Sequence, residues 1–294
     1  MASELVRELV SAGIHFGHRV SRWNPKMEPY IFGRRNMIHI IDVRETIKGL
    51  IRAKKFITRE VAQGREVLFV GTKRQARHAI TSNAESVKMP YVIRRWLGGT
   101  LTNFRTIRSR LGRLEELETE LGGEVESRLS KKATSALNRQ LRKIKSNLEG
   151  IRQMEKLPGA LFVVDVRREH LAVREAKKLG IPTVCLIDTD SDPDFADIPI
   201  PGNDDSMRSI ETILRHISQA IEEGLRARTA GGPATEESRF HRRSSRATTS
   251  RTAPSPEDAE QPTAESAGQP SEAAEQLDQG SDDSSSQLPA MREG

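Results

Sequence analysis

Cysteine is nearly absent from this chain of 294 residues, which contains only Cys185. One cysteine permits no internal disulfide, so we exclude a disulfide-stapled secreted scaffold and expect a reducing, cytoplasmic setting. Because Cys185 lies inside the apolar run 183–187, we expect a buried, unreactive thiol. No apolar run approaches the ~18 residues of a membrane span, and charges at Glu4 and Arg7 interrupt any apolar leader, so neither a signal nor an anchor is expected.

The sequence motifs of common enzymes are missing as well. There is no GxGxxG dinucleotide fingerprint, no GxxxxGK[ST] phosphate loop and no GxSxG nucleophile elbow. His15 and His18 are three residues apart, but no cysteine or paired-histidine motif completes a zinc site. We therefore expect no catalytic residue, no bound metal, no cofactor and no small-molecule substrate.

Aromatic residues make up only 4% of the chain, and residues 231–294 contain one, Phe240. This stretch is rich in Ser, Ala, Glu, Pro, Gln and Thr, so it cannot bury enough apolar surface to offset the entropy cost of ordering. We predict a disordered, low-complexity tail over 227–294. With six arginines against twelve acidic residues, 231–294 has a net charge of −6, which leaves about +12 on the rest. A basic body indicates an anionic partner, and no basic amphipathic helix with bulky aromatic residues suggests a membrane.

Short apolar runs rich in branched and aromatic residues predict buried strands. They alternate with helical patterns at about 44–62, 74–87 and 169–179, and a last helix is expected at about 206–223. Strands buried on both faces that alternate with helices are typical of a parallel sheet between helical layers. The run 198–201 contains two prolines, which lack the backbone donor that a central strand needs. The predicted strands are 38–41, 67–70, 161–164 and 183–187, with a weaker candidate at 91–93.

The alternation is interrupted once, at about 104–155. Leucine and isoleucine recur there at steps of three and four residues in two stretches, 107–121 and 137–151. This is close to the heptad spacing of helices that pack side by side. Gly122 and Gly123 suit a break between the stretches, so we predict an antiparallel helical hairpin, or short coiled coil, that projects from the sheet domain. Ordinary helices that cover the sheet are the alternative.

The segment 94–105 carries the strongest functional signal. It contains Arg94, Arg95 and Arg105 together with Trp96, a second aromatic and a pair of glycines. Arginine forks suit phosphate oxygens, aromatic faces suit exposed bases, and glycine lets the backbone approach a ligand. The pattern therefore predicts a polyanion, and RNA in particular, as the partner. The alternative is that Trp96 belongs to the core and the arginines to a solvated face.

Two further segments fit the same partner. Arg34 and Arg35 follow the run 30–33, and so repeat the combination of aromatic residues, glycine and arginine. Strand 67–70 leads into a segment, 71–77, that contains a glycine, a threonine and three basic side chains where a helix is expected to begin. Free backbone amides and the dipole at such a helix start favour a phosphate group, here one of a nucleic-acid backbone.

The aspartates of 188–194 are the most enzyme-like feature, because they directly follow a predicted strand. Carboxylates gathered at the carboxyl end of a parallel strand can hold magnesium, and Asp165 at the end of another strand could join them. The competing interpretation is a turn whose Asp and Ser side chains cap local amides. A magnesium-dependent enzyme acting on phosphorylated ligands through Asp165, Asp188 and Asp190 therefore remains as the alternative function.

Six sequence motifs occur together, in order, over residues 1 to about 226: 13–18, 23–27, 30–36, 69–73, 95–103 and 188–193. With these motifs the chain resembles the bacterial family of small-subunit ribosomal protein two. The stretch 201–205 is similar to the closing motif of the same family.

The resemblance implies a flavodoxin-like three-layer α/β/α domain with a parallel sheet, built from 1–103 and 156–226. The helical hairpin, 104–155, would be inserted into this domain, and the disordered tail, 227–294, would follow it. The resemblance also implies a structural, non-enzymatic constituent of the small ribosomal subunit. Such a protein would bind small-subunit rRNA where head meets body, contact neighbouring ribosomal proteins, support late assembly and translation, and help to recruit ribosomal protein one.

We assign the rRNA contacts of the family only to positions of this chain that match its motifs, and we add the basic residues next to them. The tail departs from the family pattern because it extends past the usual family end, and no motif assigns it a role. A third interpretation, a protein-recruitment platform with the hairpin as docking surface, stays open. The predicted rRNA-binding residues are Trp23, Lys26, Arg34, Arg35, Lys73, Arg74, Arg94, Arg95, Trp96, Asn103 and Arg105.

Overall fold

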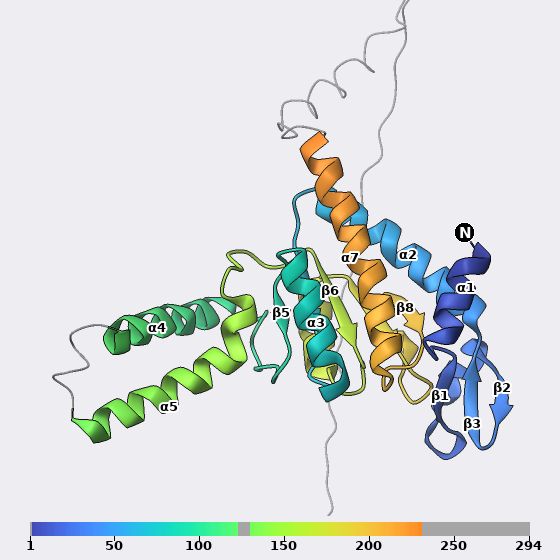
Figure 1. The fold of residues 1–294 in the computed structure, drawn as a ribbon, viewed down its shortest axis with the longest axis horizontal. Helices are drawn as coiled ribbons and strands as arrows, with labels where there is room; N and C mark the ends of the chain where they lie inside the picture. The colour runs from blue at the N-terminus through green and yellow to red at the C-terminus, as the bar shows by residue number, and fades with distance from the viewer. Residues whose placement is uncertain (1, 123–129, 231–294) are drawn as a thin grey trace, which may run out of the picture. The chain divides into compact units, whose positions relative to one another are not determined.

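The computed structural model of the chain describes residues 2–122 and 130–230. The predicted disordered tail beyond Ala230 lies outside the described residues, as does Gly123 of the expected hairpin break. The described chain forms one parallel and one antiparallel sheet, with helices around them (Figure 1). The predicted mixed α/β class is therefore confirmed.

The larger sheet has five parallel strands in the order β5-β4-β6-β7-β8. Val67 lies opposite Ala160, and Leu161 lies opposite Thr183, so the apolar runs of three central strands are in register. The strands expected at 67–70, 161–164 and 183–187 are confirmed. The five strands are β4 (Val67–Val70), β5 (Tyr91–Val92), β6 (Ala160–Val164), β7 (Thr183–Ile187) and β8 (Ile198–Pro201).

Alternate residues of the central strands enter two apolar cores on opposite faces of the sheet. Val67 and Phe69 of β4 belong to one core, whereas Leu68 and Val70 belong to the other. This two-sided burial explains why the central strands are continuous apolar runs. The first core is completed by α2 (Val43–Ala62), α3 (Arg74–Ser86) and α7 (Met207–Ala230), and the second by α6 (His170–Leu179) and part of α4 (Phe104–Gly122).

Strand β8 carries its prolines at the edge of the sheet. It borders only β7, so the missing donors of Pro199 and Pro201 are tolerated as they would not be in the centre. Helix α2 crosses this strand closely at Gly49, where an added Cβ would lie 2.5 Å from the Pro199 carbonyl oxygen. A glycine is required there by space.

The predicted strand at 38–41 belongs to a different sheet from the one expected. It is β3 (Ile38–Ile41), the centre of an antiparallel sheet of order β1-β3-β2 with β1 (Phe16–Arg19) and β2 (Ile31–Arg35). The expectation of a parallel strand is wrong here, because the run alternates between buried and half-buried side chains instead of being buried on both faces. Asn36 and Met37 join β2 to β3 with φ of 50° and 61°, the left-handed pair that a tight hairpin turn needs.

Helices α4 and α5 (Lys131–Leu148) lie side by side in the region where two packed helices were predicted (Figure 1). Leu114 is fully buried, and Ile144 packs against the same core from the other helix. Across the pair, Lys145 Nζ lies 3.3 Å from Glu118 Oε1. Apolar and ionic contacts therefore both join the two helices.

The remaining elements are an N-terminal helix and several short 3-10 helices. The final helix, α7, continues to Ala230, seven residues beyond the end predicted at 223, and Cys185 is fully buried as expected. Within the described residues, every helix is too short or too polar to cross a membrane. The other elements are α1 (Ala2–Ser11) and the 3-10 helices η1 (Val20–Arg22), η2 (Pro25–Tyr30), η4 (Glu149–Ile151) and η5 (Pro193–Phe195).

Candidate nucleic-acid interface

The loops that follow the five parallel strands lie at one edge of the sheet, because parallel strands all point the same way. The segment that contains β1 joins this edge: the His18 amide donates to Thr189 Oγ1 at 2.9 Å, and the Asn24 amide donates to the Thr189 carbonyl at 2.8 Å. Gly17 allows this approach, since an added Cβ would lie 2.6 Å from Thr189 Cγ2. Sequence motifs far apart in the chain therefore meet at the carboxyl edge.

Lys73 lies inside this edge and is surrounded by carboxylates. Its Nζ lies 2.7 Å from Asp204 Oδ1, 2.6 Å from Asp205 Oδ1 and 3.6 Å from Asp165 Oδ2, and the residue is only 8% exposed. Burial alone would lower the pKa of the ammonium, but the carboxylates outweigh it and hold the pKa above its usual range. The predicted rRNA contact at Lys73 thus has its charge already paired within the protein.

Two buried aspartates lie beside His18 at the same edge. His18 Nδ1 lies 3.7 Å from Asp188 Oδ2, and burial raises the pKa of Asp188 to about 6. Burial, and then the neighbouring Asp188 and Asp165, raise the pKa of Asp204 to about 8. The Oδ2 atoms of Asp188 and Asp204 have no hydrogen-bond partner among the described residues. The polar atoms of these two carboxyl groups are therefore only partly satisfied by the described part of the protein.

One histidine and two aspartates have the geometry to hold a metal ion. His18, Asp188 and Asp204 each offer a ligand atom, and these atoms lie within 4.8 Å of one another. An imidazole with two carboxylates is a ligand set that Zn²⁺ accepts. The sequence did not reveal this grouping, because His18 is brought to Asp188 only by the docking of β1, and the single available signal was the Gly17 beside it.

The segment predicted to carry the strongest signal is anchored by one carboxylate of α6. Glu175 Oε1 accepts from the Gly99 amide at 2.8 Å and from Trp96 Nε1 at 3.1 Å, and Oε2 accepts from the amides of Leu101 and Thr102 at 3.0 and 3.2 Å. Burial alone would raise the pKa of Glu175, but these hydrogen bonds outweigh it and hold the pKa below its usual range. The sequence gave no sign that Glu175 fixes this loop.

Trp96 is an internal residue of that loop. Only 6% of it is exposed, and it packs in the core that also contains Ile107 and Leu111 of α4. Its indole N–H is used by Glu175. The structure therefore places Trp96 in the core, where it supports the loop. This agrees with the alternative interpretation of the sequence, in which Trp96 is a core residue.

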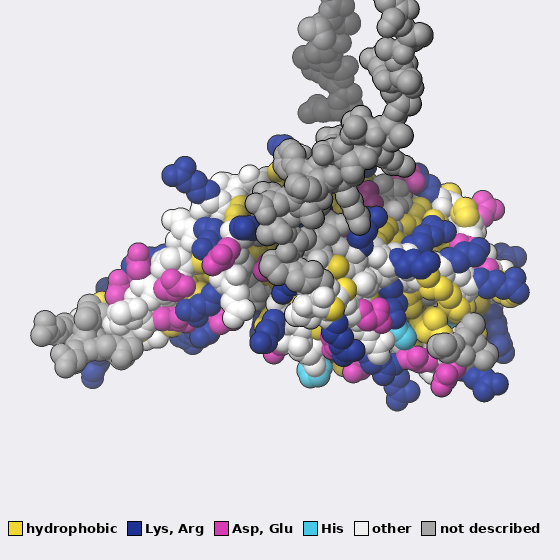
Figure 2. All heavy atoms as spheres, turned by 90° about the horizontal axis from the view of Figure 1, so that it is seen from above, with side chains coloured by type: hydrophobic (Ala, Val, Ile, Leu, Met, Phe, Trp, Pro, Cys, Tyr) yellow, Lys and Arg dark blue, Asp and Glu magenta, His cyan; other side chains and the backbone are white. Residues whose placement is uncertain are grey.

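The predicted arginines have a different environment from Lys73. All of them are exposed, and among the described residues none of them forms an ion pair with Asp or Glu. Figure 2 shows Lys and Arg side chains distributed along the whole of that view, with acidic groups interspersed. Asn103, also exposed, accepts from the Thr106 hydroxyl at 2.8 Å through its side-chain oxygen. The unpaired set is Arg34, Arg35, Arg74, Arg94, Arg95 and Arg105.

The last two predicted residues lie next to the antiparallel sheet. Lys26 Nζ is 2.8 Å from Asp192 Oδ2 and 2.5 Å from Asp194 Oδ2, and hydrogen bonds to these aspartates raise its pKa. The ring of Trp23 is half-buried, with its centroid 5.3 Å from that of His39. Both residues stay predictions as RNA contacts, and the arginines have the freer charges.

An α/β domain with exposed arginines beside its parallel sheet and on β2, none of them paired with an acidic group of the described residues, has the features of a polyanion-binding protein. The similar proteins described next are ribosomal. The family model of Ribosomal protein S2 matches residues 9–224. The chain belongs to this family.

Individual relatives agree with the family match. The small ribosomal subunit protein uS2 of Rhodopirellula baltica is 59% identical over 221 residues, which cover 75% of this chain and 85% of that protein. The protein of the same name from Acidothermus cellulolyticus is 50% identical over 231 residues, covering 78% and 84%. That of Thermobifida fusca is 47% identical over 232 residues, covering 79% and 80%.

Family membership decides several predictions. The expectations of a ribosomal protein of the small subunit with a structural role, rather than an enzyme, and of a cytoplasmic location are confirmed. The alternative of a magnesium-dependent enzyme through Asp165, Asp188 and Asp190 is not supported by this family. Two of these aspartates lie against β1 instead: His18 Nδ1 is 3.7 Å from Asp188 Oδ2, and His18 Nε2 is 3.5 Å from Asp190 Oδ2.

Proposed function

We propose that this protein binds small-subunit rRNA through the exposed arginines at the carboxyl edge of its sheet and on β2. The observation that carries the proposal is that all six predicted arginines are exposed and have no acidic partner among the described residues. A free guanidinium can form paired hydrogen bonds with a phosphate without first breaking an internal ion pair. Each such contact releases counterions from RNA, so many weak contacts together give substantial affinity.

The finer details of the fold belong to the same proposal. In chain order, the parallel strands of the order β5-β4-β6-β7-β8 are second, first, third, fourth and fifth, which supports a flavodoxin-like arrangement. The side-by-side packing of α4 and α5 supports a hairpin, 104–155, inserted between 1–103 and 156–226. We propose that this hairpin has coiled-coil packing and that the arginine-bearing loop 94–105 leads into it.

Binding where head meets body, a part in late assembly and the recruitment of ribosomal protein one rest on the family resemblance. A protein partner also has apolar surface to contact, since Phe32 and Met37 of the β2–β3 hairpin are 79% and 71% exposed. Both side chains belong to one hairpin, and their exposed apolar surface is available for contact with a protein partner. Because Arg34 and Arg35 belong to the same hairpin, RNA and a neighbouring protein would share it, and the other four arginines would contact RNA elsewhere.

The test is the salt dependence of binding to small-subunit rRNA fragments, measured for the full chain. Replacing Arg34 and Arg95 together with Ala should make the slope of log K against log salt shallower by about 2, since each lost phosphate contact removes roughly one unit. The matched control replaces Arg113 and Arg226, which pair with Glu120 and Glu222. A flat salt response of the unaltered protein, or equal slopes for both double variants, would contradict the proposal.

A further inference from the structure

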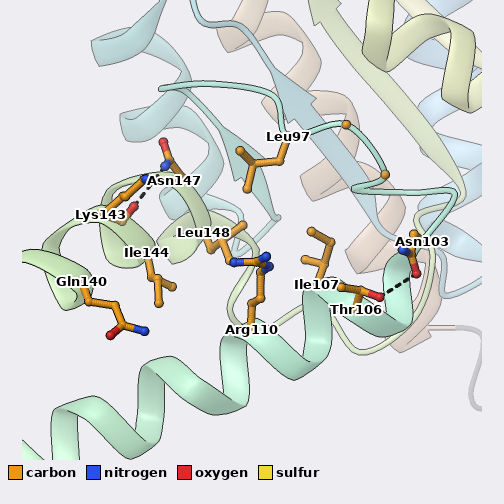
Figure 3. A pocket seen from close by; sticks show the side chains of 12 residues that line it. Leu97, Asn103, Thr106, Ile107, Arg110, Gln140, Lys143, Ile144, Asn147 and Leu148 are labelled. Carbon is orange, nitrogen blue, oxygen red and sulfur yellow. Dashed lines mark hydrogen bonds between the residues drawn. The ribbon is translucent and has the colours of Figure 1, made fainter. Parts of the chain in front are cut away.

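A hollow of about 520 Å³ lies where α4 and α5 meet the arginine-bearing loop. Figure 3 shows its walls: Ile107 and Arg110 come from α4, Ile144 and Asn147 come from α5, and Leu97 closes it from the loop. Its volume lies within the range of about 300–1,000 Å³ that is typical of small-molecule sites. The hollow is therefore large enough to hold one nucleotide of RNA.

The lining separates into an apolar part and a polar part. Leu97, Ile107, Ile144 and Leu148 provide aliphatic surface, of which Ile107 and Leu148 are almost fully buried. Side-chain amides and a hydroxyl stand around this surface. Asn147 Nδ2 already donates to the Lys143 carbonyl at 3.0 Å, and the Thr106 hydroxyl donates to Asn103 Oδ1 at 2.8 Å. The Gln140 amide and the Asn147 side-chain oxygen can still bond to the edge of a base. These polar residues are Asn103, Thr106, Gln140 and Asn147.

The charge of the hollow is of one sign. Arg110 and Lys143 line it, and no acidic residue is among its lining residues. Neither cation forms an ion pair within residues 2–122 and 130–230, whereas Arg113 and Lys145 nearby pair with Glu116 and Glu118. Figure 3 shows Arg110 reaching from α4 into the space toward α5. The charge therefore favours an anionic occupant such as a phosphate.

The surrounding helices extend this bias. Helix α5 has six basic residues and no acidic one, and the first half of α4 contains Arg105, Arg108, Arg110 and Arg113 before its first glutamate at 115. A second hollow, by contrast, has both signs of charge in its lining, with three glutamates beside Lys88 and Arg152. The hollow between α4 and α5 has only positive charges in its lining and is therefore the better suited of the two to a polyanion.

The loop side of the hollow is held in place. Glu175 accepts from the amides on both sides of Thr100, and Gly99 has a φ of +90° that suits glycine. Gly98 also lines the space, and an added Cβ there would meet nothing within 4 Å. A preformed wall lowers the ordering cost of binding, so the site favours a ligand that inserts without rearranging it.

We propose that this hollow holds one unpaired nucleotide of small-subunit rRNA. The base lies on Leu97 and Ile144, the amides of Gln140 and Asn147 bond to its edge, and Arg110 and Lys143 bind the flanking phosphates. Sequence-specific contacts to RNA generally use such unpaired bases, because side chains cannot read base edges in the deep, narrow major groove of an RNA duplex. The inference rests on the proposed function and adds a base-reading site to a surface that otherwise binds phosphate.

The experiment is chemical probing of Watson–Crick edges with dimethyl sulfate and carbodiimide in rRNA bound to the full-length protein. We expect at least one base that the unaltered protein protects and that Q140A/N147A leaves reactive, while overall affinity falls less than about fivefold. R110A/K143A should weaken binding by about tenfold at 0.1 M salt. The matched control R113A/K145A removes the same charge from the same helices and should keep the protection.

Identical protection by all four proteins would overturn the inference while leaving the proposed function intact. No binding of the unaltered protein to small-subunit rRNA would overturn the proposed function as well. An amine-reactive crosslink from Lys143 to another ribosomal protein in assembled subunits, with no base whose protection depends on Gln140 and Asn147, would assign the hollow to a protein segment and also overturn the inference. Circular dichroism of the variants guards against loss of the fold, and alanine has the highest helix propensity of all residues.

Discussion

Lys73 and Arg95 each lie three residues beyond a strand of the same parallel sheet, yet their surroundings are opposite. Lys73 follows β4 and is 8% exposed among three carboxylates. Arg95 follows β5, is exposed, and has no acidic partner among the described residues. Two cations at equivalent positions therefore have different functions: one stabilises the fold, and the other is available to a ligand.

The position of each strand in the sheet explains the difference. Strand β4 has β5 on one side and β6 on the other, so the loop after it is enclosed by other loops, including the one that carries Asp165. Strand β5 is an edge strand, so the loop after it faces solvent on one side. A basic residue near a strand end therefore becomes a ligand contact only where neighbouring loops leave it unpaired.

The largest expected effect is on stability, from replacing Lys73 with Ala. This change leaves the carboxylates of Asp165, Asp204 and Asp205 without their cation at a mostly buried site, and should lower the free energy of unfolding by about 3 kcal/mol. Urea denaturation with the unaltered protein as reference measures it. A loss below about 0.5 kcal/mol would mean that Lys73 is not the structural cation described above.

The next effect tests how β1 docks beside this cluster. Replacing Gly17 with Ala puts a Cβ 2.6 Å from the Thr189 side chain, and overpacking of this kind costs about 1–3 kcal/mol. Replacing Gly33 with Ala is the control, since its Cβ would meet nothing within 4 Å. Thermal unfolding of both variants gives the comparison, and equal melting temperatures would show that β1 can move without cost.

A smaller effect on stability is expected from replacing Glu175, which anchors the loop that carries Arg95. Replacing it with Gln weakens the hydrogen bonds to the loop amides and should cost about 1 kcal/mol. Because its pKa is lower in the folded protein, the stabilisation is complete above the unfolded carboxyl pKa of about 4.3 and is lost as pH falls through the folded pKa. NMR shifts of the Gly99 and Leu101 amides should titrate together below about pH 4.3, and a transition above that value would contradict this assignment.

The smallest effect on stability is expected at the arginines themselves. Replacing Arg74 with Ala should change the free energy of unfolding by less than about 0.5 kcal/mol, because the side chain is exposed and unpaired. The same change should still weaken rRNA binding and make the salt slope shallower by about 1. Paired measurements of urea unfolding and RNA affinity on one preparation separate the two properties.

The sequence predicts much of the parallel sheet, because residues such as Phe69 and Phe162 lie in runs that are apolar on both faces. It misplaces β3, because a short run with His39 in it fits either kind of sheet, and the left-handed Asn36–Met37 turn has no strong local signal. The helices α4 and α5 are predicted successfully, because their contact depends on a local repeat of leucine and isoleucine that the sequence shows directly.

The candidate site is predicted less completely, because its properties depend on which loops meet. Residue type alone cannot separate Lys73 from Arg95, nor show that Trp96 gives its indole N–H to Glu175. The grouping of His18 with Asp188 requires β1 to dock onto the far end of the chain, which no local pattern reveals. What the sequence does establish is the chemistry of the surface, since the arginines predicted as contacts are all exposed.

The most direct measurement compares the salt slopes of rRNA binding for K73A and for R34A/R95A, at a temperature where both remain folded. The slope for R34A/R95A should be shallower than that of the unaltered protein by about 2, and the slope for K73A should be unchanged. A shallower slope for K73A together with an unchanged one for R34A/R95A would contradict the division between a structural lysine and ligand-binding arginines.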